Sequence, residues 1–260
     1  MYTFVLHALL ALVMLAVAMS FAGTYIVTRR QVFIAGGITH TCFGGLGLGY
    51  WLGFSPALGA LVFALGGAWG ARSLSRTMRS DSAIASIWAL GMALGILFVF
   101  LSNGNAPELN TFLFGNVLTV AALDLWLLLA YTVVLALFSI LFHRLIVTVS
   151  FDEAFSRTRR LPVAAVDLIM TLMVAVGIVL GIRLIGIMLL MSLVSLPQTT
   201  AERFTHSYSR LLIYSAVISL TACMGGLAAA WYLGVPASAC IVILMALFYA
   251  LAMLVTRRKR

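Results

Sequence analysis

The sequence predicts an all-helical integral membrane protein, and three observations lead to this prediction. Of the 260 residues, 63% are hydrophobic and only 9% are charged, whereas about a quarter of the residues in a soluble globular domain are charged. The mean hydropathy is +1.15, which is more apolar surface than a soluble core can bury. Apolar runs of about 20 residues, the length that crosses the hydrocarbon core of a bilayer as a helix, recur along the whole chain.

Nine such runs are predicted to span the membrane, with the whole chain, 1–260, forming a single transmembrane domain. They cover residues 4–27, 33–53, 56–71, 83–102, 119–142, 164–182, 184–201, 210–233 and 236–256. The third run is short, and only a turn around Arg183 separates the sixth from the seventh. An arrangement of eight spans with one re-entrant segment is therefore the alternative.

The distribution of basic residues predicts the orientation of the chain. Of the 16 Lys and Arg residues, 15 fall on the connections and terminus of one side, and Arg183 alone falls on the other. Cytoplasmic loops carry an excess of Lys and Arg, so the C-terminus is predicted to be cytoplasmic and the N-terminus external. The net charge of +9 then reflects topology, and no nucleic-acid partner is expected. The three cysteines lie in apolar runs without a CxxC motif, which argues against a disulfide framework or a zinc ribbon.

Two connections are long enough to have a role of their own. Residues 103–118 are predicted to be external and to form a short helix over the outer mouth of the protein. Residues 143–163 are predicted to be cytoplasmic, with an amphipathic piece in which Phe151 and Phe155 lie one helical turn apart. No Gly-rich phosphate loop ending in Lys-Ser or Lys-Thr occurs in the sequence, so any ATP that drives this protein is expected on another chain.

The second predicted span is rich in glycine. Small residues recur every four positions on one face of it, at Gly37, Thr41, Gly45, Gly49 and Gly53. Small residues at this spacing allow a neighbouring helix to approach closely in lipid, so tight packing is the predicted role of this stripe.

One ionisable side chain, His40, lies near the middle of the same span. Gly36 and Gly44 are its neighbours one turn before and one turn after, which predicts an open surround. Ionisable groups inside a bilayer are costly and usually face a bundle interior or a water-filled path, and imidazole is a common ligand of zinc, copper, iron and nickel. We therefore predict that His40 contacts a transported metal ion, with Gly36, Thr39 and Gly44 lining the path. The alternative is a neutral histidine that donates to a backbone carbonyl.

Four segments, in order along the chain, resemble a known family. They are RRQVFIAGGITHTCFGGLGLGYWLGFSPALGA (29–60), LNTFLFGNVLTVAALDL (109–125), SFDEAFSRTRRLP (150–162) and LIGIMLLMSLVSLPQTTAERF (184–204). The sequence resembles the membrane permease subunit of ATP-driven ABC importers for zinc, manganese and iron. The resemblance covers nearly the whole chain.

The resemblance implies a transport subunit with no enzymatic activity and no permanently bound cofactor. Two permease copies would enclose a path for a divalent transition-metal ion, with Zn²⁺ first and manganese or iron next. A cytoplasmic ATP-binding subunit would hold the ATP, and a periplasmic or lipoprotein metal-binding protein would deliver the ion across the bacterial plasma (inner) membrane. The coupling segment, about 150–163, would dock on the ATPase. Its residues would be Phe151, Asp152, Glu153, Phe155, Arg157, Leu161 and Pro162.

The chain departs from the family pattern at two positions. The family has an aspartate one turn before the histidine, where this chain has Gly36, and a glycine where it has Arg160. Histidine without a carboxylate partner favours zinc or iron over manganese. The missing aspartate leaves a permease for a metal chelate or another bulky substrate as an alternative. A secondary transporter coupled to protons or sodium is a further alternative, with Asp124 and Asp167 as its nearest carboxylates.

Overall fold

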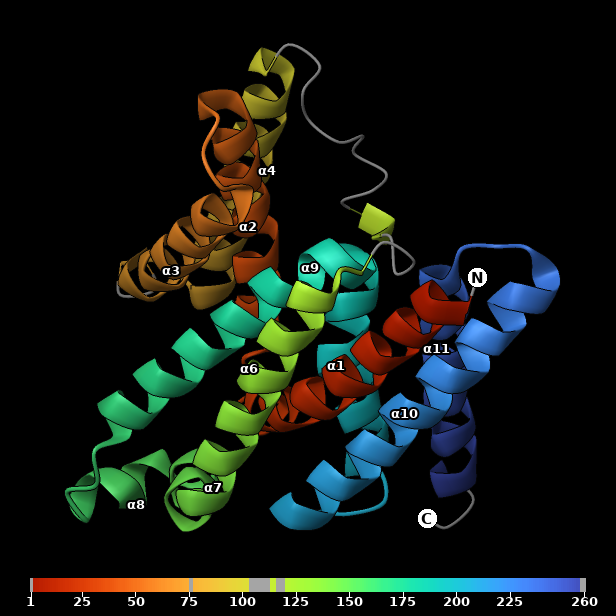
Figure 1. The fold of residues 1–260 in the computed structure, drawn as a ribbon. Helices are drawn as coiled ribbons and strands as arrows, with labels where there is room; N and C mark the ends of the chain where they lie inside the picture. Colours follow the sequence, from red (N-terminus) through yellow and green to blue (C-terminus); the bar gives the residue numbers. More distant parts are fainter. Residues whose placement is uncertain (1, 75–76, 103–112, 116–119, 258–260) are drawn as a thin grey trace.

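The computed structural model describes residues 2–74, 77–102, 113–115 and 120–257 (Figure 1). Its helices are α1 (Tyr2–Thr28), α2 (Val32–Leu52), α3 (Pro56–Leu74), α4 (Ser80–Leu101), α6 (Ala122–Leu141), α7 (His143–Phe151), α8 (Glu153–Thr158), α9 (Val163–Glu202), α10 (Tyr208–Leu233) and α11 (Ala237–Arg257). No strand occurs among these residues.

Seven of the helices are long and apolar enough to cross a membrane, namely α1, α2, α4, α6, α9, α10 and α11. α3 carries a shorter apolar stretch, and α9 has 40 residues, about twice the length that one crossing requires. Each of the nine predicted runs falls largely within a helix, with the sixth and seventh both in α9. The predicted fold class, a polytopic helical membrane protein, is confirmed. The number of crossings and the orientation of the termini stay predictions.

The helices form two groups that α9 joins (Figure 1). In one group α2 packs against both α3 and α4. In the other, α1, α6, α10 and α11 pack against α9, which also contacts α2 and α3. The short helices α7 and α8 lie at the lower end of α6, at the same end of the molecule as the C-terminus.

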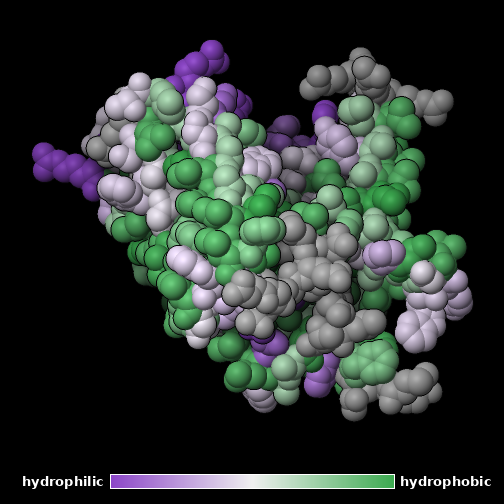
Figure 2. Space-filling view, turned by 90° about the horizontal axis from the view of Figure 1, so that it is seen from above, coloured by the Kyte–Doolittle hydropathy of each residue, from purple (hydrophilic) through white to green (hydrophobic). Residues whose placement is uncertain are grey.

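Many large apolar side chains are exposed, as expected of a protein that is surrounded by lipid. Figure 2 shows hydrophobic side chains over most of the face seen from above, with hydrophilic residues projecting at a few places along its edge. Trp69 is 75% exposed, Phe100 84% and Tyr232 88%. Leaving a large apolar side chain in water costs about 1.5–3 kcal/mol, a cost that contact with acyl chains removes.

α2 packs against its two neighbours through small residues. A Cβ on Gly45 would overlap the backbone of Gly59 in α3, and a Cβ on Gly91 of α4 would lie 2.6 Å from Cα of Thr41 in α2. Close approach of this kind is what small residues provide in lipid, so the predicted packing role of the stripe is confirmed. Its last member, Gly53, instead ends α2 with a φ of 74° and open space around it.

α9 consists of two helical segments joined at Gly186, where φ is 74° and ψ is 169°. Figure 1 shows the second segment turning back towards the lower end of the molecule. This backbone conformation is essentially restricted to glycine, so the turn lies at Gly186. The predicted turn position at Arg183 is wrong, because that residue belongs to the first helical segment, where its side chain is exposed.

The Gly186 turn packs directly against residues 113–115. A Cβ on Gly186 would lie 2.5 Å from the carbonyl oxygen of Leu113, and a Cβ on Gly115, whose φ is 69°, would overlap the backbone of the turn. The Leu-Phe-Gly motif therefore holds the α9 turn by backbone contact. The rest of the predicted external segment, 103–118, lies outside the described residues.

The second segment of α9 contains a proline, and a neighbouring side chain supplies the missing hydrogen bond. Pro197 has no N–H, so the carbonyl oxygen of Leu193 loses its helical donor. Nε2 of Gln198 donates to that oxygen at 3.1 Å and to the carbonyl oxygen of Met19 in α1 at 3.0 Å. The buried Gln198 side chain thus completes α9 and links it to α1.

Gly186→Ala tests the role of the turn. The apparent melting temperature of the detergent-purified protein is expected to fall, because the strained backbone alone costs about 1–3 kcal/mol and the new Cβ meets Leu113. Gly66→Ala in α3 is the control, since a Cβ there meets nothing within 4 Å. That variant is expected to keep the wild-type melting temperature or to exceed it. Equal shifts in the two variants would contradict the assignment.

Candidate functional site

The ring of His40, in the middle of α2, lies against α4. It stacks on the indole of Trp88, with ring centroids 4.0 Å apart and planes 15° apart. Its Nδ1 lies 3.3 Å from Sδ of Met92. The side chain is partly exposed, and no described residue forms a hydrogen bond with Nε2. A thioether sulfur is a weak acceptor, so this geometry suits an Nδ1–H directed at the sulfur, with the lone pair on Nε2.

The three residues predicted to line a path beside the histidine are buried in this structure. A Cβ on Gly36 would lie 3.2 Å from Cε of Met191, and one on Gly44 would lie 2.8 Å from Cε1 of Phe63. The Thr39 hydroxyl donates to its own helix and lies 3.4 Å from Sδ of Met191. Side chains of α3 and α9 thus fill the surround that the glycines were expected to leave open, because they reach the bare backbone of α2. The lining role of these residues stays a prediction.

The donors around the histidine are few and soft. Imidazole suits zinc, copper, iron and nickel, whereas carboxylates suit manganese. No group of three or more His, Cys, Asp or Glu side chains that could hold a metal ion occurs in the described part of the chain. A metal ion at His40 would therefore need further ligands from outside the described part of this chain.

The sequence does not single out the two partners of the histidine ring. Trp88 and Met92 lie four residues apart, so they share one face of α4. This spacing is the only signal that the sequence offers. Which helix that face meets is decided by the packing of α2 against α4, which no local pattern specifies.

The predicted coupling segment, 150–163, contains the last two residues of α7 and the whole of α8, so the prediction that Phe151 and Phe155 lie one turn apart on a single helix is wrong. α7 ends at Phe151 and α8 begins at Glu153, and the backbone of Asp152 between them is extended, with φ of −142° and ψ of 91°. The carboxylate of Asp152 accepts a hydrogen bond from the backbone N of Phe155 at 2.8 Å and so caps α8. Phe151 is 58% exposed and Phe155 49%. The segment therefore presents two aromatic side chains at the surface.

The segment ends in a tight turn at Arg160. Its φ of 55° lies in the left-handed region that favours glycine, which explains why the related family has glycine here. An arginine adopts this backbone at a cost of about 1 kcal/mol. Leu161 is half-buried, and Pro162 precedes the first residue of α9. Arg160 thus adopts a backbone conformation that glycine adopts readily.

Glu153 is paired with two arginines. Its Oε1 accepts hydrogen bonds from Nε and NH2 of Arg157 at 3.0 and 2.7 Å, and its Oε2 lies 2.9 Å from NH2 of Arg29. The hydrogen bonds from Arg157 and then from Arg29 lower the pKa of Glu153. The Arg157 side chain is 70% exposed and that of Arg29 only 11%, so Glu153 connects the surface of the segment with the body of the protein.

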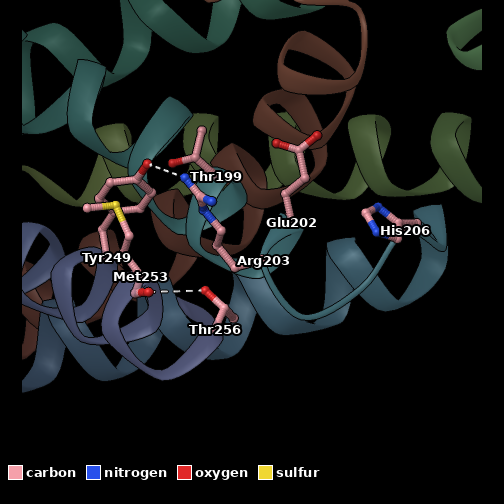
Figure 3. Close-up of a pocket in the computed structure, with 7 residues that line it drawn as sticks. All are labelled: Thr199, Glu202, Arg203, His206, Tyr249, Met253 and Thr256. Carbon is pink, nitrogen blue, oxygen red and sulfur yellow. Dashed lines mark hydrogen bonds between the residues drawn. The ribbon is translucent and has the colours of Figure 1, made fainter. Parts of the chain in front are cut away.

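An open cleft of about 600 Å³ lies between the end of α9, the loop that follows it and the last turns of α11 (Figure 3). The guanidinium of Arg203 donates to the Tyr249 hydroxyl at 3.0 Å and lies over the ring of that tyrosine. Figure 3 shows that the side chains of Glu202 and His206 do not point toward one another. They do not form a metal-binding pair in this structure.

The two acids considered for an ion-coupled secondary transporter both have local partners. Asp124, in the first turn of α6, accepts a hydrogen bond from the backbone N of Ala121 at 3.2 Å. Asp167 accepts one from the Tyr25 hydroxyl at 2.7 Å and lies 3.6 Å from NH2 of Arg29. These contacts give both carboxylates structural roles and do not favour the secondary-transporter alternative.

Comparisons with known proteins agree with the resemblance carried by the four segments. Residues 1–256 match the ABC 3 transport family. A protein of Chlamydia pneumoniae named "Probable metal transport system membrane protein" is 34% identical over 94% of this chain and 86% of its own. The manganese transport system membrane protein MntC of Halalkalibacterium halodurans is 26% identical over 96% of this chain and 87% of its own.

The fold is also that of a solved structure. PsaBC from Streptococcus pneumoniae in complex with Fab superposes with a TM-score of 0.88 at 24% identity, covering 96% of this chain and 91% of that chain. The apolar helices, the α7–α8 segment and the family match thus lead to one conclusion. The chain belongs to the ABC 3 transport family and is a multi-pass membrane permease of the kind found in metal transport systems.

Proposed function

We propose that this permease imports a divalent transition-metal ion, zinc first, into the cytoplasm by alternating access. The observation that carries the proposal is the family match over nearly the whole chain, with relatives named as metal transport proteins. Two copies of the chain enclose the path in the bacterial inner membrane. Two cytoplasmic ATPase subunits bind ATP and drive the switch in access, and an external binding protein, periplasmic or a lipoprotein, delivers the ion. The permease itself does no covalent chemistry.

His40 is the proposed contact with the ion. An Nδ1–H directed at the sulfur of Met92, with the ring stacked on Trp88, holds the imidazole in one tautomer and orientation. The lone pair on Nε2 is then available to a cation. In a two-fold dimer the same residue of both chains is placed symmetrically, so two imidazoles facing the path provide two nitrogen ligands.

The donor chemistry favours zinc over manganese. Nitrogen and sulfur surround the proposed contact, and glycine stands at position 36, where the family has a carboxylate. Relatives named for manganese transport include one that is 26% identical, so manganese remains a substrate to compare. A chelate needs open space, and the side chains of Met191 and Trp88 occupy the space beside Gly36. This packing does not favour the chelate alternative.

The α7–α8 segment is the proposed docking site for the ATPase. Phe151 and Phe155 supply the exposed aromatic anchors, and a short helix laid into a groove is a common form of protein recognition. Arg157 and Arg159 stand at the rim, with the guanidinium of Arg159 over the Phe155 ring.

His40→Ala tests the metal contact in proteoliposomes that contain the permease, its ATPase and its binding protein. ATP-dependent zinc uptake is expected to fall at least about tenfold, equivalent to the loss of about 1.4 kcal/mol of ligand interaction. His7→Ala is the control, because that imidazole lies on α1 and contacts the carbonyl oxygen of Val120. Uptake that is indifferent to His40 would identify the ring as a packing element. Failure of any free ion to move would favour the chelate alternative.

Gly36→Asp tests the basis of metal preference. The new carboxylate lies one turn before His40, and its Cβ meets only the flexible end of Met191 at 3.2 Å and the Trp88 ring at 3.6 Å. The ratio of manganese to zinc uptake is expected to rise about tenfold, because carboxylate oxygen suits manganese better than imidazole alone does. Gly36→Asn has nearly the same shape without the charge and is expected to leave the ratio unchanged. An equal rise in both variants would mean that size, not charge, sets the preference.

Phe155→Ala tests the docking surface. The affinity of the permease for its ATPase, measured by titration of the two purified proteins in detergent, is expected to fall about tenfold, because exposed aromatic residues often dominate interfaces. Phe204→Ala removes a similarly exposed ring, 53% exposed, from the loop after α9 and is the control. Unchanged binding of Phe155→Ala would rule out α8 as the docking element.

A further inference from the structure

An arginine with a mostly enclosed side chain joins the coupling segment to the body of the protein. Arg29 directly follows α1, and its side chain is 11% exposed. Its NH2 lies 2.9 Å from Oε2 of Glu153 in α8 and 3.6 Å from Oδ1 of Asp167 in α9. Its NH1 donates to the carbonyl oxygen of Val149 in α7 at 3.2 Å. One guanidinium thus contacts three separate helices.

The carboxylate of Asp167 brings α1 and the start of α2 into the same cluster. The Tyr25 hydroxyl of α1 donates to Oδ1 of Asp167 at 2.7 Å, and Nε2 of Gln31 lies 3.5 Å from the same oxygen. Gln31 immediately precedes Val32, the first residue of α2. His40 lies on that helix about 12 Å further along its axis, at 1.5 Å per residue. The cluster therefore connects the coupling segment with the helix that carries the proposed metal contact.

The two carboxylate oxygens of Glu153 contact different arginines. Its Oε1 accepts a hydrogen bond from the exposed Arg157, and its Oε2 forms an ion pair with Arg29, whose side chain is mostly enclosed. Guanidinium is planar and presents its donors in a fixed fork. A displacement of α8 therefore moves the Arg29 guanidinium or breaks its ion pair with Glu153. Arg30, the next residue, is exposed and makes no ion pair with the described residues. Of the two neighbouring arginines, only Arg29 forms ion pairs with described residues of α8 and α9, so its contacts depend on its position and not on its charge alone.

We infer that Arg29 is a positioning residue that transmits movement of the coupling segment to α2 and α9. This inference rests on the proposed function, in which α7 and α8 dock on an ATPase. Movement of α8 reaches α9 through Asp167, and it reaches α2 through the short connection of residues 29–31. Without Arg29, ATP hydrolysis continues but no longer drives the switch in access. A purely structural clamp would instead lower uptake and hydrolysis together.

The test measures metal ions transported per ATP hydrolysed in proteoliposomes holding the permease, its ATPase and its binding protein, with zinc as the ion. Arg29→Gln is expected to lower this ratio about tenfold, within the usual range of coupling between sites, while the ATPase stays bound and active. Arg29→Lys keeps the charge without the fork and is expected to give an intermediate ratio. Arg30→Gln removes the same charge from the neighbouring residue and is expected to leave the ratio unchanged.

Glu153→Gln and the double variant locate the path of transmission. If Arg29 and Glu153 act as one link, the double variant has no lower ratio than Arg29→Gln alone, because the effects of residues in one network do not add. A wild-type ratio in Arg29→Gln, or an equal fall in Arg30→Gln, would overturn the inference. If Arg29→Gln fails to assemble, a wild-type ratio of metal ions transported per ATP hydrolysed in Arg29→Lys would also overturn the inference. Failure of the proposed function would appear separately, as the absence of ATP-driven zinc uptake by the wild type.

Discussion

The lipid solvent is the constraint on which the rest of this structure depends. Inside a bilayer no hydrophobic force draws helices together, and every backbone polar group needs a partner within the protein. Because no hydrophobic force holds the helices together, they associate by close packing at glycine, as where Gly45 contacts Gly59. Side chains supply the missing backbone hydrogen bonds, as where Gln198 replaces the donor that Pro197 lacks. Charged side chains concentrate near the helix ends, where the cluster around Arg29 forms.

The glycine content of α2 explains the environment of its histidine. A helix with so few bulky side chains has its neighbours packed onto its backbone, so the groups around His40 come from other helices. Trp88 and Met92 of α4 set the orientation of the ring, and Met191 of α9 lies beside Gly36. A soft environment thus stands where the family has an acidic one. The same helix begins beside the Arg29 cluster, so the proposed transmission link lies at the start of the element that carries the proposed contact.

The end of the predicted coupling segment departs from the family pattern at a position where the backbone is of the kind that glycine favours. Arg160 adopts the positive φ for which the family uses glycine, and Asp152 provides the cap that separates α7 from α8. The outcome is a pair of exposed aromatic rings next to a half-exposed carboxylate that is paired with Arg29 and Arg157. Both features come from one stretch of chain, so the proposed docking surface and the contact with Arg29 lie side by side in it.

The sequence by itself determined the helices, their apolar faces, the packing role of the glycine stripe and the lone position of His40. These features depend on composition and on spacing along a single helix. Only the tertiary structure decided that the α9 turn lies at Gly186 against Leu113, that Met92 and Trp88 hold the histidine, and that Arg29 meets Glu153 and Asp167. Hydropathy and periodicity describe what each helix can bury. They do not specify which residues far apart in the chain meet, because that choice depends on the packing of all the helices at once.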